Sequence, residues 1–161
     1  EQIGLNLRTV YIGGGTPTSL SEVLPRNSVY KIYAGLREEY CSKGQRVLPT
    51  RDIRLARRMV RDHKFRGHSP EKTISMWGRV CDGEDRYIKV FKPEADLLVD
   101  TSFSYELCVL AGMIEPLAGS LPEKDPYAEK MNELAGHFAL FDPIPLELVP
   151  KNSMLREFLG E

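Results

Sequence analysis

The 161-residue sequence lacks several features that would assign it to a class directly. Its three cysteines form no CxxC pair, so neither a disulfide framework nor a paired-thiol metal site is expected. No run approaches the roughly 18 apolar residues of a membrane span, and no signal peptide opens the chain, which favours a cytoplasmic protein without membrane partners. The first residue is Glu1, not Met, so we expect the natural N-terminus to lie further upstream.

The sequence also contains no G-x-x-x-x-G-K-[ST] phosphate loop. Such a loop holds nucleotide phosphates with backbone N–H groups and a lysine. Any phosphate site in these residues must therefore use other groups.

A concentrated basic segment stands out instead. Residues 51–66 contain six arginines and one lysine against two aspartates, a local formal charge of +5, whereas residues 91–161 carry −8. One basic patch on an otherwise acidic protein favours a single localised anionic ligand. No aromatic side chains alternate with the arginines, so nucleic acid is the less favoured partner.

Hydrophobic periodicity predicts a helix over residues 51–66, with Thr50 as its N-cap and Gly67 as its stop. Arg54, Arg58 and Arg61 are spaced four and three apart, so they share one face, with Arg57 beside them. Like charges at these spacings repel, and an anionic ligand such as phosphate would offset the repulsion. A solvated basic face, partly neutralised by acidic neighbours, is the alternative.

The rest of the sequence indicates strands and helices in alternation, and thus an α/β layered fold. The expected helices begin at Ser69, near residue 127 and near residue 153, and residues 105–110 form a helix or a strand. Trp77 and Tyr105 are expected to be core aromatics. Strands are expected over residues 8–12, 29–34 and 95–101, a loop or frayed helix over 37–46, a charged turn over 81–85 and a loop over 116–126.

The arginine segment fits the pattern D-x-R-L-x-R-R-x-x-R-D-x-x-x-R-G, from Asp52 to Gly67. This pattern is similar to the lid segment of uridine kinases and of the wider phosphoribulokinase family. The resemblance covers about residues 25–160 and includes the segments 68–73 and 149–160. It implies the C-terminal part of a P-loop-kinase-like, doubly wound parallel sheet, from which the lid helix over residues 51–66 projects.

By this resemblance, the full-length protein transfers a phosphoryl group from ATP–Mg²⁺ to the 5′-hydroxyl of a nucleoside such as uridine. The catalytic candidates are Arg57, Arg58 and Arg61; Arg54, Asp62 and Arg66 complete the nucleotide-binding set, which contains no metal ligand. The expected partners are nucleotides, nucleosides and an N-terminal half of the same protein that carries the phosphate loop. Without that half, we expect this chain to be inactive. The alternative is a non-catalytic module that binds nucleotide or phosphate.

Residues 1–24 are set apart as a strand-turn segment, and an origin foreign to residues 25–161 is one interpretation of it. Within it, residues 8–21 resemble the GGGTPT strand and turn of radical-SAM coproporphyrinogen oxidases. The C-x-x-x-C-x-x-C motif that holds the iron–sulfur cluster in that family is absent from this sequence. A fragment related to that family is therefore a further alternative, and a simple tight turn is another.

Overall fold

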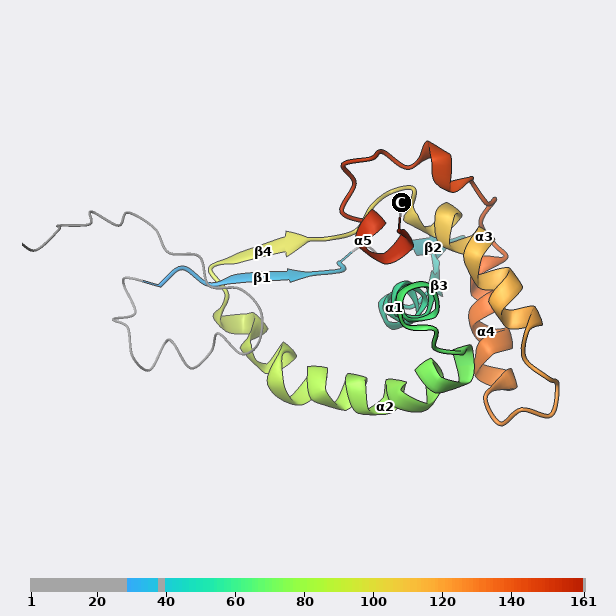
Figure 1. Cartoon of the computed structure of the whole chain (residues 1–161). Helices are drawn as coiled ribbons and strands as arrows, with labels where there is room; N and C mark the ends of the chain where they lie inside the picture. Colours follow the sequence, from blue (N-terminus) through green and yellow to red (C-terminus); the bar gives the residue numbers. More distant parts are fainter. Residues whose placement is uncertain (1–28, 38–39, 161) are drawn as a thin grey trace, which may run out of the picture.

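The computed structural model describes residues 29–37 and 40–160 (Figure 1). The strand expected over residues 8–12 and the GGGTPT segment lie outside this part of the chain. Among the described residues, no helix combines the length and apolar character that crossing a membrane requires. The elements in chain order are β1 (Ile32–Gly35), β2 (Tyr40–Ser42), β3 (Gln45–Leu48), α1 (Thr50–Arg66), α2 (Pro70–Tyr87), η3 (Lys89–Glu94), β4 (Leu97–Asp100), α3 (Glu106–Gly119), α4 (Ala128–Phe138), η4 (Leu146–Leu148) and α5 (Arg156–Leu159).

Helix α1 lies at the centre of the molecule, where Figure 1 shows it end-on with the other helices around it. It packs against α2, α3 and α5. Its apolar face is fully buried, with Ile53, Leu55 and Met59 each at most 1% exposed. The helix expected over residues 51–66 is therefore present, and other helices cover its apolar face, as its hydrophobic periodicity requires. Its action as a lid stays a prediction.

Local sequence signals set both ends of α1 and the start of α2. Pro49 is the N-cap of α1, one residue before the predicted Thr50. Gly67 ends α1 in the left-handed conformation at φ 62°, as predicted, and its N–H donates to the Asp62 carbonyl. Ser69 caps α2 through a hydrogen bond from the Lys72 N–H, and Pro70 occupies the first helical position.

Helix α2 continues to Tyr87, so the turn predicted over residues 81–85 is wrong. The charges that suggested a turn bind α1 instead. Arg51 donates to Asp85 at 2.6 Å, and Arg54 pairs with Glu84. These contacts hold the last two turns of α2 beside α1 despite the low helix propensity of Gly83.

Two small sheets complete the mixed α/β architecture. Strands β1 and β4 pair in parallel, with Ile32 opposite Leu97 and Gly35 opposite Asp100. The loop predicted over residues 37–46 is mostly an antiparallel hairpin of β2 and β3. Its two-residue turn places Lys43 at φ 51° and Gly44 at φ 77°. Two consecutive positive φ angles suit the right-handed twist of a hairpin, and the sequence analysis did not recognise this Lys-Gly signal.

The C-terminal third is helical. Helix α3 runs through Pro116 to Gly119, so the loop predicted from residue 116 starts only at Ser120. Helix α4 packs antiparallel beside α3 in Figure 1, and α5 packs against α1. Leu110, Ile114, Leu134, Phe138 and Leu159 are each at most 1% exposed, so these helices and α1 share one core.

Candidate functional site

Four arginines of α1 line one cavity together with side chains of α2 and α5. The cavity has a volume of about 230 Å³. We call it the arginine pocket; its lining residues are Arg54, Arg57, Arg58, Arg61, Trp77, Val80 and Phe158. The structure thus brings together the arginines that the sequence analysis singled out, apart from Arg66, which lies outside the lining.

Arg57 is the most buried of these arginines, at 8% exposure. Its Nε donates to the fully buried carboxylate of Glu106 at 2.8 Å, and a terminal nitrogen donates to the Thr101 carbonyl at 2.9 Å. Its guanidinium carbon lies 5.4 Å from the centre of the Phe158 ring. These contacts fix Arg57 in place, so it contributes positive charge to the pocket from a rigid position.

Asp62 forms ion pairs with the arginines of the second half of α1. This aspartate is fully buried and forms ion pairs with Arg58 at 3.3 Å, Arg61 at 3.0 Å and Arg66 at 3.0 Å. His68 Nδ1 lies 4.0 Å from the same carboxylate. Asp62 thus fixes the positions of these guanidinium groups. In the Arg58 pair, the buried Nε lies 3.3 Å from the Asp62 carboxylate but makes no hydrogen bond.

Arg54 forms the wall nearest the end of α2. Burial lowers the pKa of Arg54 from its usual value, and the like charges of Arg51 and Arg57 act in the same direction. The Glu84 carboxylate, only 7% exposed, lies in contact with the Arg54 guanidinium and offsets this cost.

The arginines outnumber the carboxylates that hold them. The four lining arginines (54, 57, 58 and 61) pair with the three buried carboxylates Asp62, Glu84 and Glu106, which leaves a formal charge of +1, and Arg66 outside the lining adds a further positive charge at Asp62. Each guanidinium is held by at least one carboxylate. The site is thus positive and preorganised, which suits an anion with several oxygens.

The pocket lies beside the carboxyl end of the parallel sheet. Strand β4 ends at Asp100, and the next residue, Thr101, provides the carbonyl that Arg57 contacts. The Asp100 carboxylate accepts hydrogen bonds from the Ser102 hydroxyl at 2.6 Å and the Arg37 N–H at 3.1 Å, and these bonds, the Ser102 bond foremost, lower the pKa of Asp100. Ligands of open α/β sheets bind at this end of the strands.

Three pocket residues, Trp77, Val80 and Phe158, were not among the sequence-based site residues, and neither was Glu106, which anchors Arg57. Trp77 was assigned to the core, and the structure places it against the core and on the pocket wall. Phe158 lies in the segment 149–160, which was noted for its family resemblance, whereas Glu106 lies in residues 105–110, which were expected as a helix or a strand. The signal for Glu106 was its position after a strand, at the start of a helix, in an otherwise apolar stretch.

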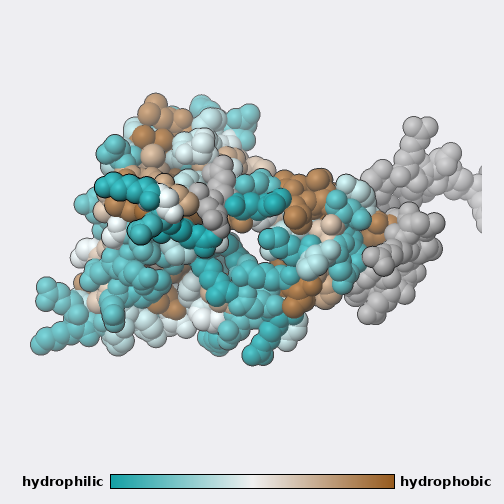
Figure 2. Space-filling view, turned by 180° about the vertical axis from the view of Figure 1, so that it is seen from behind, coloured by the Kyte–Doolittle hydropathy of each residue, from teal (hydrophilic) through white to brown (hydrophobic). Residues whose placement is uncertain are grey.

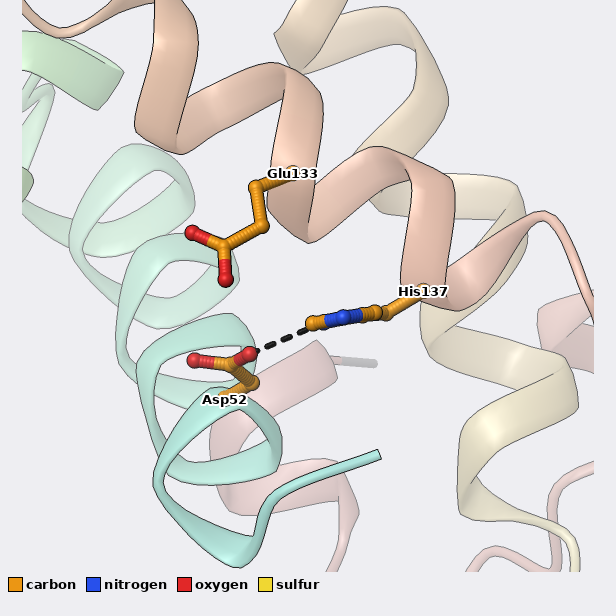
Figure 3. Close-up of side chains that lie close together, drawn as sticks. All are labelled: Asp52, Glu133 and His137. Carbon is orange, nitrogen blue, oxygen red and sulfur yellow. Dashed lines mark hydrogen bonds and ion pairs between the residues drawn. The ribbon is translucent and has the colours of Figure 1, made fainter. Parts of the chain in front are cut away.

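A second polar cluster joins α1 to α4. Asp52, Glu133 and His137 present ligand atoms within 4.8 Å of one another, a spacing that a metal ion would accept (Figure 3). His137 Nδ1 lies 2.9 Å from Asp52, while Lys130 Nζ lies 3.2 Å from Asp52 and 2.9 Å from Glu133. The Lys130 ammonium therefore already supplies the cation, and the cluster clasps the two helices together.

Residues 45–105 match the model of the Phosphoribulokinase / Uridine kinase family. This segment runs from β3 to the residue before α3 and contains all the arginines of the pocket. The match confirms the family resemblance over these residues. No curated protein and no solved structure matches the chain.

Proposed function

Because residues 45–105 match a family of kinases, we propose that this chain is the lid-containing part of a uridine-type nucleoside kinase. In the complete enzyme, the arginine pocket would hold the phosphates of ATP during transfer to the 5′-hydroxyl of a nucleoside. The observation that carries the proposal is the convergence of four α1 arginines on one positive cavity beside the end of β4.

The arginines suit phosphoryl transfer for a physical reason. Negative charge spreads over the oxygens of the transferred group, and catalysis depends mainly on positioning and on fixed positive charge. Arg58 and Arg61 are 27% and 28% exposed, so they can reach a ligand while Asp62 keeps their heads in place. Arg57 would act from a fixed position behind them.

The residues of the pocket fit ATP better than they fit a free magnesium ion. Its nearest carboxylates, those of Asp62, Glu84 and Glu106, are all engaged by arginines. Mg²⁺ would therefore arrive with the nucleotide and neutralise phosphate charge. The pocket residues themselves would bind and orient the phosphate oxygens.

The test is calorimetric titration of ATP–Mg²⁺ into the 161-residue protein and into an Arg58→Ala/Arg61→Ala variant. The matched control is Arg79→Ala/Arg86→Ala, which removes the same charge from exposed positions of α2. Saturable binding by the wild type and the control, lost in the pocket variant, is expected. No binding by a cooperatively folded wild type, or equal binding by all three proteins, would overturn the proposal.

A non-catalytic phosphate-binding module is the second candidate. It is favoured by the lack of a G-x-x-x-x-G-K-[ST] motif in these 161 residues. Incubation of the longest natural form of the protein with ATP–Mg²⁺ and uridine separates the two functions. Formation of uridine monophosphate supports the kinase, whereas ATP binding without product supports the module.

A further inference from the structure

The lining of the arginine pocket contains two chemically different kinds of side chain. One kind consists of guanidinium groups from α1, and the other consists of Trp77 and Val80 from α2 and Phe158 from α5. Inorganic phosphate would interact with the guanidinium groups only. A lining that combines four arginines with apolar side chains is suited to a ligand that carries both negative charge and an apolar ring.

The two aromatic rings differ in what they already contact. Phe158 faces the Arg57 guanidinium, so its ring is engaged. Trp77 is partly buried against the core, and in the described part of the chain it has no aromatic or cationic stacking partner. Since α2 is tied to α1 by the Arg54–Glu84 and Arg51–Asp85 pairs, Trp77 is held at a fixed place on the pocket wall.

We propose that Trp77 is a base-stacking residue, so that the pocket binds a nucleotide through its ring on Trp77 and its phosphates on Arg58 and Arg61. This inference rests on the proposed function and adds the part of the ligand that the arginines do not contact. The cavity of about 230 Å³ is smaller than a typical pocket for a whole ligand, so it takes part of the nucleotide and leaves the rest at its open side.

Stacking of one base on an aromatic side chain strengthens binding by roughly tenfold or more. The phosphate contacts are common to ATP and to inorganic triphosphate. A difference in affinity between these two ligands therefore measures the contribution of the nucleoside portion, and its loss in a Trp77 variant assigns that contribution to the indole.

The experiment uses the fact that Trp77 is the only tryptophan in the 161-residue sequence. Its fluorescence is followed while the protein is titrated with ATP–Mg²⁺ or with inorganic triphosphate–Mg²⁺, and free tryptophan derivative corrects for absorption by the nucleotide. Calorimetry then compares wild type, Trp77→Leu and Trp77→Phe. Leucine removes the ring, and phenylalanine keeps an aromatic face.

We expect ATP to quench the fluorescence of Trp77 and to bind about tenfold more tightly than triphosphate. Trp77→Leu should lower the affinity for ATP to that for triphosphate and leave triphosphate binding unchanged, and Trp77→Phe should retain most of the difference. Equal affinities of the wild type for ATP and triphosphate overturn the stacking role but leave the phosphate site standing. Absence of binding by both ligands overturns the proposed function as well.

If Trp77→Leu does not fold, the wild-type fluorescence titration carries the test: quenching by ATP but not by triphosphate places the base beside Trp77, and equal quenching by both ligands overturns the inference. If Trp77→Leu folds cooperatively but has equally reduced affinity for both ligands, Trp77 supports the structure of the pocket without stacking on a base. That outcome also overturns the inference.

Discussion

The helical body around α1 buries its apolar side chains, whereas the β1–β4 sheet leaves apolar side chains exposed. In the body, Leu55, Leu110 and Phe138 are at most 1% exposed. In the sheet, Ile32 is 56% exposed and Leu97 is 43% exposed. Hydrophobic side chains also gather on the side of the molecule where this sheet lies, at the right of Figure 2.

This difference in burial shows which region contributes most to stability. Parallel sheets are normally covered on both faces, whereas the β1–β4 pair has exposed apolar residues and only two described strands. The helices bury their apolar faces against one another. We therefore expect the stability of the described part to come from the helical body, which also carries the walls of the arginine pocket.

The largest effect is expected from Glu106→Gln within the helical body. This change removes the charge that compensates the buried Arg57 guanidinium. Breaking a buried ion pair from one side costs about 3–5 kcal/mol of unfolding free energy, because the remaining charge stays buried without a partner. Urea denaturation followed by circular dichroism measures the loss.

Two variants complete this test. Glu115→Gln changes an exposed glutamate of the same helix and should alter the unfolding free energy by less than about 0.5 kcal/mol. Replacement of the whole pair, Arg57→Met/Glu106→Leu, should recover most of the stability, since no charge is then left alone. A Glu106→Gln loss no larger than that of Glu115→Gln would contradict the structural role of the pair.

A matched pair of truncations compares the body with the sheet directly. Leu110→Ala removes a fully buried side chain and should cost about 2–5 kcal/mol through lost burial and the cavity left behind. Val99→Ala removes a side chain that is 37% exposed and should cost less than about 1 kcal/mol. Equal losses in urea denaturation would show that the sheet is as strongly packed as the helices.

The sequence predicted the parts of the fold whose signals are local. The periodicity of residues 51–66, the Gly67 stop and the Ser69–Pro70 start of α2 were all found in the structure. The length of α2 was not predictable in this way, because its second half depends on pairs with Arg51 and Arg54, which lie 34 and 30 residues away along the chain. The β2–β3 hairpin was missed because its strands are only three and four residues long.

In the candidate site, too, local features were predictable from the sequence and long-range contacts were not. The arginine pattern identified which side chains meet in the pocket, since residues three and four apart share a helical face. It did not reveal that Arg57 is buried, because its partner Glu106 lies 49 residues further along the chain. It did not place Trp77 and Phe158 on the pocket wall either, since that depends on how α2 and α5 pack against α1.

The smallest effect on the unfolding free energy is expected at the polar cluster of Asp52, Lys130, Glu133 and His137 that joins α1 to α4. The hydrogen bond from Lys130 lowers the pKa of Glu133 below its usual range, and Lys130 and His137 add favourable charge. A carboxyl whose pKa is lowered on folding stabilises the protein above its unfolded pKa of about 4.3, and this contribution disappears as the pH falls through the lowered value. Glu133 is half exposed, so screening limits the contribution to about 0.3 kcal/mol.

Urea denaturation of wild type and Glu133→Gln at pH 7, 5, 4 and 3 measures this contribution. The difference in unfolding free energy should be present at pH 7, decline below pH 5 and vanish in the most acidic sample. Because Asp52 and His137 are present in both proteins, the comparison isolates Glu133. At pH 7, 1 M salt should reduce the difference as well, since the pair is exposed. A difference that grows on acidification would mean that Glu133 is destabilised by its surroundings, and the Lys130 contact would then not be the one that holds α4 to α1.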